Sequence, residues 1–131
     1  MKSTAPADRA LFFVAAAFNA LVTIGLAIPN TPAWGLLGIA PPQPLLILHL
    51  FLVMPAVFGL AYFWIGLNIV GKRSLILVAI IGKLSVFAVA LTHYLTGMIP
   101  AGLPMLASGD LFFALLFVRV YRRYPKFYGT D

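Results

Sequence analysis

Four long apolar runs constrain this chain more than any other feature. They cover approximately residues 10–28, 45–68, 75–95 and 104–121. A run of about 17–24 residues is long enough, as a helix, to cross a hydrocarbon layer about 30 Å thick. Hydrophobic residues make up 63% of the 131 positions, more than a water-soluble domain of this size can bury. We therefore predict an all-α membrane protein, with residues 1–131 forming a single domain that folds as a four-helix transmembrane bundle.

The first loop, residues 29–44, contains five prolines and no charged residue. Thr31 followed by Pro32 is typical of a helix start, with a capping residue before proline in the first turn. A short helix from Pro32 to about Ile39 is therefore expected. Trp34 would place this helix at the lipid–water interface, where indole rings are favoured, and Trp64 is expected to anchor the second span in the same way.

The charges indicate how the spans are oriented. The net charge is +6, and every Lys and Arg except Lys83 lies near the N-terminus, in the turn at residues 71–73, or towards the C-terminal tail. Positive residues favour the cytoplasmic side, so both termini are predicted to be cytoplasmic in a bacterial inner membrane. The residues expected to set this orientation, and to contact anionic lipid, are Lys72, Arg73, Arg119, Arg122, Arg123 and Lys126.

The composition also excludes several classes of function. No basic face with interleaved aromatic or polar residues is present, which argues against nucleic-acid binding. The chain has no cysteine, so disulfides, thiolate metal sites and cysteine nucleophiles are excluded. No cofactor-binding motif is found in the sequence.

Two charged residues lie inside apolar runs. Charged groups within a membrane are costly, and such residues usually face the interior of a helix bundle. Lys83 has alanines at helical spacing on its face, and Asp110 lies between Ala107 and Ala114. Small neighbours are typical of helix–helix interfaces, so both charges are expected to point inward. Three arrangements remain open from the sequence: a direct Lys83–Asp110 contact, a link through water, or a link through Asn19.

A second polar group is expected nearer the outer surface. His93 and His49 have estimated depths similar to that of Asp110, and Thr23 shares a helix face with Asn19. A cluster of Asp110 with both histidines and Thr23 is therefore expected at the outer mouth. No metal is predicted, because the histidines lie on different helices and lack metal-ligand spacing. The candidate polar pocket comprises Lys83, Asp110, His93, His49, Asn19 and Thr23.

The overall pattern resembles the small DoxX-like membrane proteins of bacteria. The resemblance lies in four short spans, a Pro/Gly-rich first outer loop and a basic turn between the second and third spans, and it extends over the whole chain. Gly82-Lys83 and Gly109-Asp110 also look like a recurrent feature of small four-helix proteins. The resemblance implies a role as subunit or partner of a redox enzyme, and it identifies no functional residue.

Three classes of function follow. We favour an accessory or structural membrane protein, acting as a subunit of a larger complex or as a homo-oligomer. The alternative is a protein that binds or transports a small molecule or lipid through an outward-facing polar pocket. An intramembrane enzyme using Asp110 and His93 ranks last, because no nucleophile or metal set accompanies them. A water-accessible cavity reaching these residues would favour the second class, and tight packing the first.

Overall fold

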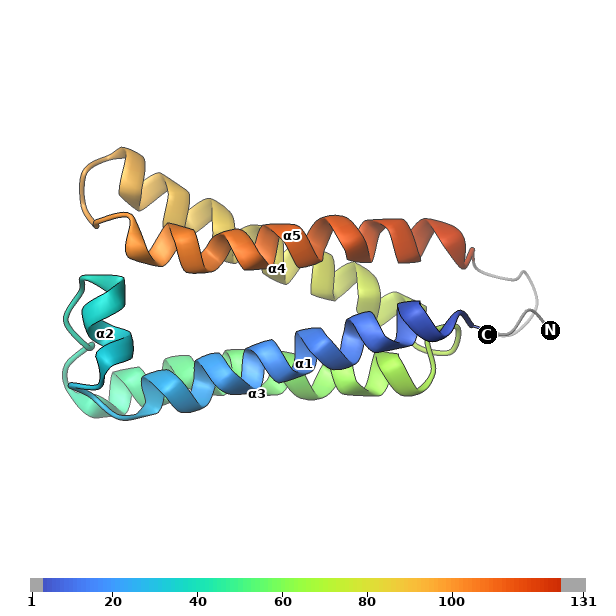
Figure 1. The fold of residues 1–131 in the computed structure, drawn as a ribbon, viewed down its shortest axis with the longest axis horizontal. Coiled ribbons are helices and arrows are strands. Elements are labelled where there is room, and N and C mark those ends of the chain that lie inside the picture. The colour runs from blue at the N-terminus through green and yellow to red at the C-terminus, as the bar shows by residue number, and fades with distance from the viewer. Residues whose placement is uncertain (1–3, 126–131) are drawn as a thin grey trace.

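The computed structural model describes residues 4–125, and these residues form helices and connecting loops (Figure 1). The helices are α1 (Pro6–Ala27), α2 (Pro32–Leu37), α3 (Leu45–Leu67), α4 (Arg73–Leu95) and α5 (Gly102–Arg123). Four of them, α1, α3, α4 and α5, are long and apolar enough to cross a membrane. The predicted all-helical fold class is thus confirmed.

The helices lie where the hydrophobic runs predict them, with differences at the ends. α1 begins at Pro6, four residues earlier than expected, because proline is favoured in the first turn and Asp8 complements the positive end of the helix dipole. The short helix predicted in the first loop is α2. It ends at Leu37, where Gly38 takes up the left-handed conformation (φ 67°) that commonly terminates helices.

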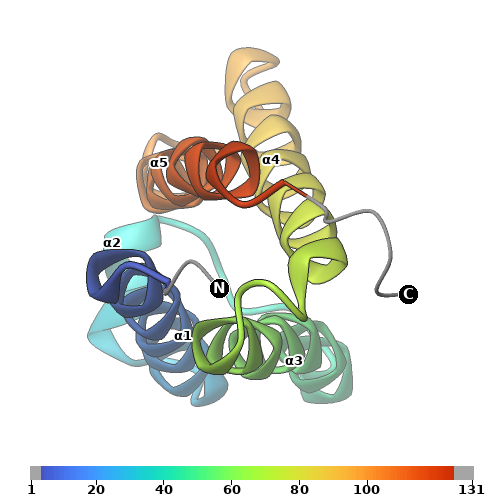
Figure 2. The same ribbon diagram turned by 90° about the vertical axis from the view of Figure 1, so that its right-hand side faces the viewer.

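The long helices are arranged as two pairs. α1 packs along α3, and α4 packs along α5 (Figure 2). The start of α1, the α3–α4 turn and the end of α5 lie together at one end of the molecule, which we call the terminal end. The other end, which contains α2, is called the α2 end. The two pairs approach each other closely towards the terminal end and diverge towards the α2 end (Figure 1).

An aromatic cluster joins the two pairs. Phe117 of α5 is fully buried, and its ring stacks on that of Phe12 at a centroid distance of 4.6 Å. Tyr62 of α3 lies 5.4 Å from the same ring, and Phe113 lies 6.1 Å from it. Aliphatic side chains from all four long helices and from the α3–α4 turn complete this core.

A second, smaller core lies at the α2 end. It includes Trp34, which is 7% exposed, and the location of this residue at the lipid–water interface stays a prediction. Trp34 packs in one cluster with Leu26 of α1 and Leu48 of α3, because α2 folds back over the ends of the first pair. Trp64, by contrast, is half-exposed on α3, and its role as an interface anchor stays a prediction.

Candidate functional site

The candidate site is a buried network around Lys83, near the middle of α4. The Lys83 side chain is 2% exposed, and its Nζ atom lies 2.5 Å from Oδ1 of Asp110 on α5. The same nitrogen donates a hydrogen bond of 3.2 Å to Oδ1 of Asn19 on α1. Lys83 therefore contacts both Asp110 and Asn19, the two residues that the sequence indicated as its possible partners.

Helix geometry explains how the two charges meet. With α4 ending at Leu95, Lys83 lies about 18 Å from that end at 1.5 Å per residue. α5 begins at Gly102, two residues earlier than predicted, so Asp110 lies about 12 Å from its helix start. The remaining difference of about 6 Å is within reach of the long flexible lysine stem, which lies along apolar surface.

Asn19 extends the network to the fourth long helix. Its Nδ2 atom donates a 3.0 Å hydrogen bond to the backbone carbonyl of Pro55 in α3. α1 and α3 approach each other closely at Gly59, where a Cβ atom would lie 3.2 Å from the Cβ of Asn19, tighter than an ordinary contact. Thr23 lies one turn further along α1, and its hydroxyl donates to the Asn19 carbonyl. The network therefore connects all four long helices.

Three aromatic rings surround the lysine ammonium group. The Nζ atom of Lys83 lies 5.0 Å from the ring centroid of Tyr62, 5.3 Å from that of Phe113 and 5.4 Å from that of Phe18. Such distances give favourable cation–π contacts, which are strongest when water is excluded. These rings were not among the residues predicted for the site. The available signal was that Phe113 follows Asp110 by three positions and so shares its helix face.

The two histidines do not join this site, and the expected cluster at the outer mouth is not formed. Nε2 of His49 lies 3.1 Å from the carbonyl oxygen of Ala27, and Nδ1 of His93 lies 3.0 Å from that of Val89 in its own helix. Both side chains are exposed. At about 100° per residue, His93 is rotated by about 80° from the face of Lys83, which explains its position. Within residues 4–125, no group of three or more His, Cys, Asp or Glu residues could hold a metal.

A second polar cluster, at the terminal end, was missed in the sequence. Asp8 is buried, and its Oδ2 atom accepts hydrogen bonds from the Tyr124 hydroxyl (2.8 Å) and from Arg123 (3.1 Å). The backbone N–H of Ala5 donates to the same hydroxyl at 2.9 Å. These contacts fasten the start of α1 to the end of α5, and we call them the terminal clasp.

Two of the predicted orientation residues also make internal contacts. Arg73 donates to the backbone carbonyls of Tyr124 (2.6 Å) and Tyr121 (3.3 Å), and its guanidinium lies 3.6 Å from the Tyr121 ring centroid. It thus satisfies carbonyls at the negative end of the α5 dipole. Arg123 belongs to the terminal clasp.

Three other predicted orientation residues are exposed. Lys72, Arg119 and Arg122 are exposed at the terminal end or in the last turns of α5. Their exposure leaves them free to meet lipid headgroups, and this role stays a prediction. Lys126 lies outside the described residues.

Comparisons with protein-family models, with curated proteins and with solved structures found no match. The resemblance to DoxX-like proteins therefore stays a prediction. What this chain can do follows from its own residues and their geometry.

Proposed function

We propose that this chain is a small multi-pass protein of the bacterial inner membrane that acts as an accessory or structural component. It would function as a subunit of a larger membrane complex or as a homo-oligomer. The four apolar helices support the membrane location. Many large apolar side chains remain exposed along them, a surface suited to lipid or to neighbouring transmembrane helices.

The distribution of basic residues supports an orientation with both termini in the cytoplasm. The exposed charges Lys72, Arg119 and Arg122, together with Arg73 and Arg123, lie towards the terminal end. The loops at the α2 end carry no charged residue. By the positive-inside rule, the terminal end faces the cytoplasm and α2 lies on the opposite side.

The observation that carries the proposal is that the polar groups of the network are paired with one another, with the Asp110 side chain 16% exposed. The ammonium of Lys83 is occupied by two oxygens and three aromatic faces, and Lys83 and Asn19 are almost fully buried. Buried polar groups of this kind can specify how helices pack, even where they add little stability. We therefore assign Lys83, Asp110 and Asn19 to the scaffold, where they fix the register of the four helices.

The same observation disfavours the two other classes. A transporter or small-molecule site built on this network would require a cavity that reaches it, yet the apolar groove between the two helix pairs is lined by none of Lys83, Asp110 and Asn19. An enzyme using Asp110 and His93 would require the two side chains to converge. Instead, the His93 ring contacts its own helix.

Native mass spectrometry of the protein extracted gently from its own membrane tests the proposal. We expect a stoichiometric partner chain or a defined homo-oligomer. Because the ion pair lies between helices of the same chain and not on its outer surface, the Lys83→Met/Asp110→Leu double variant should keep the same assembly. The proposal would be contradicted by a monomer that carries a small molecule, if Asp110→Asn releases that molecule while the fold persists.

A further inference from the structure

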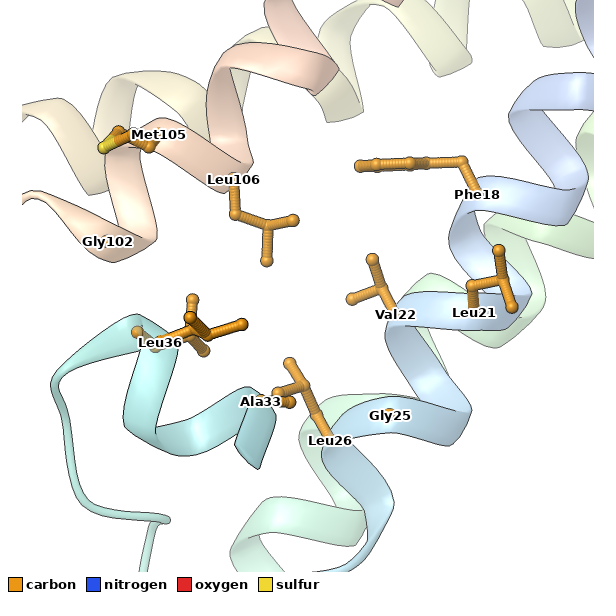
Figure 3. A pocket seen from close by; sticks show the side chains of 11 residues that line it. Phe18, Leu21, Val22, Gly25, Leu26, Ala33, Leu36, Gly102, Met105 and Leu106 are labelled. Carbon is orange, nitrogen blue, oxygen red and sulfur yellow. The ribbon is translucent and has the colours of Figure 1, made fainter. Parts of the chain in front are cut away.

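An apolar groove lies between the two helix pairs at the α2 end (Figure 3). Its volume is about 520 Å³. One wall comes from α1, where Phe18 and Val22 point into the space, and the opposite wall comes from α5 through Leu106 (Figure 3). Leu36 of α2 lies at the end of the groove. No charged side chain lines it.

Both ends of the groove are limited by the fold. At one end, α2 packs against the start of α5 so closely that a Cβ atom at Gly102 would lie 2.5 Å from the carbonyl oxygen of Leu36. Towards the middle of the bundle, Phe18 separates the groove from the buried network, since its ring contacts the Lys83 ammonium. The groove is therefore an apolar recess that opens sideways between α1 and α5.

We propose that this groove binds one hydrocarbon chain of a membrane lipid, which enters sideways from the bilayer. The inference rests on the membrane location proposed above. The lining side chains can offer a ligand van der Waals contact only, and these are the contacts that a hydrocarbon chain can make. The volume lies within the range of about 300–1,000 Å³ that is usual for sites of small ligands.

A transmembrane helix does not fit the same space. A transmembrane helix is about 10 Å wide and must run about 30 Å to cross the hydrocarbon core. Such a helix would also need to continue past the end of the groove to cross the membrane, and α2 lies across that end. The groove therefore suits a thin flexible chain better than a partner helix or a second copy of this protein.

Gly25 provides a way to fill the groove without disturbing the fold. It lines the groove, and a Cβ atom there would meet no atom within 4 Å. Gly25→Leu therefore places a side chain in the space that the lipid would occupy. Gly35 of α2 is the matched control, since a Cβ atom there also meets nothing within 4 Å and the residue does not line this groove.

The experiment uses the full chain in vesicles of phosphatidylethanolamine and phosphatidylglycerol that contain a trace of phosphatidylcholine with a photoreactive group near the end of one acyl chain. After illumination, labelled peptides are identified by mass spectrometry. We expect the label to concentrate on groove residues such as Val22 and Leu106. Gly25→Leu should reduce this labelling by about tenfold, equivalent to about 1.4 kcal/mol, and Gly35→Leu should leave it unchanged.

Two other labelling patterns would contradict the proposal or its premise. Label spread evenly over the exposed faces of the long helices, and unaffected by Gly25→Leu, would overturn the groove proposal while leaving the membrane location intact. Absence of label from all four long helices would overturn the membrane location itself. If Gly25→Leu fails to fold, Met105→Trp at the exposed rim of the groove replaces it, with the same expected loss.

Discussion

Replacing Asp110 by leucine is expected to lower the free energy of unfolding by about 3–5 kcal/mol, the usual cost of breaking a buried ion pair by removing one partner. The loss is large because Lys83 would remain buried, with a side-chain exposure of only 2% and the single oxygen of Asn19 as its polar partner. The measurement is reversible unfolding of the purified protein in mixed micelles of mild and denaturing detergent. Lys83→Met should cost a similar amount, because it leaves Asp110 without its counter-charge.

The double variant Lys83→Met/Asp110→Leu supplies the control for this prediction. Replacing both charges with apolar groups of similar size removes the cost of burying them, so most of the stability should return. The two single effects would then be strongly non-additive, as expected for residues in direct contact. Single variants that each cost less than about 1 kcal/mol, the range of exposed ion pairs, would contradict the buried pair.

Phe117→Ala is expected to cost about 3 kcal/mol or more, as for other large-to-small changes in a core. Phe117 is fully buried, and its ring contacts those of Phe12, Tyr62 and Phe113, so truncation leaves a cavity between the two helix pairs. Between helices in a membrane, such packing contacts supply much of the association energy. The same unfolding measurement applies.

Phe112→Ala is the matched control, because Phe112 neighbours the cluster in sequence but is 61% exposed. Lipid chains can replace the contacts that its ring makes, so this truncation should cost far less. Equal losses for the two phenylalanines would show that Phe117 does not lie in the core described above.

The four long apolar helices and the inward-facing positions of Lys83 and Asp110 were predictable because each rests on a short-range rule, whereas the direct contact between the two charges was one of three arrangements left open. The length and hydrophobicity of a run identify a spanning helix, and the residues three and four positions away identify the face that a charge shares. Lys83 and Asp110 have alanines at those positions, and Ala79, Ala107 and Ala114 are all buried. The helix ends were less certain, and the shift of the α5 start to Gly102 changed the depth of Asp110 by about one half-turn.

The terminal clasp and the aromatic rings around Lys83 were missed because they depend on contacts between helices far apart in the chain. Asp8 and Tyr124 are 116 positions apart, and nothing in the local pattern around either residue pairs them. The predicted positions of the two histidines were wrong for a different reason. Depth alone placed His93 beside Asp110, but rotation around the helix axis directs it elsewhere.

The groove between the two helix pairs could not be predicted from the sequence either. Its existence depends on the divergence of the two helix pairs and on the position of α2 between them, which are properties of the assembled fold. Leu21 and Val22 are typical of any lipid-facing or buried helix surface. Gly25 was the one available signal, since it leaves an opening where other residues would fill it.

We propose that the chain spans the inner membrane four times with the terminal end in the cytoplasm, and cysteine labelling tests this topology. Because the protein has no cysteine, single-cysteine variants report position without interference. Lys72 lies exposed at the terminal end, and Met98 lies exposed in the loop between α4 and α5. In intact spheroplasts, a membrane-impermeant maleimide should label Met98→Cys and should label Lys72→Cys only after lysis. Labelling of Lys72→Cys in intact spheroplasts, whether or not Met98→Cys is labelled as well, would contradict the proposed orientation.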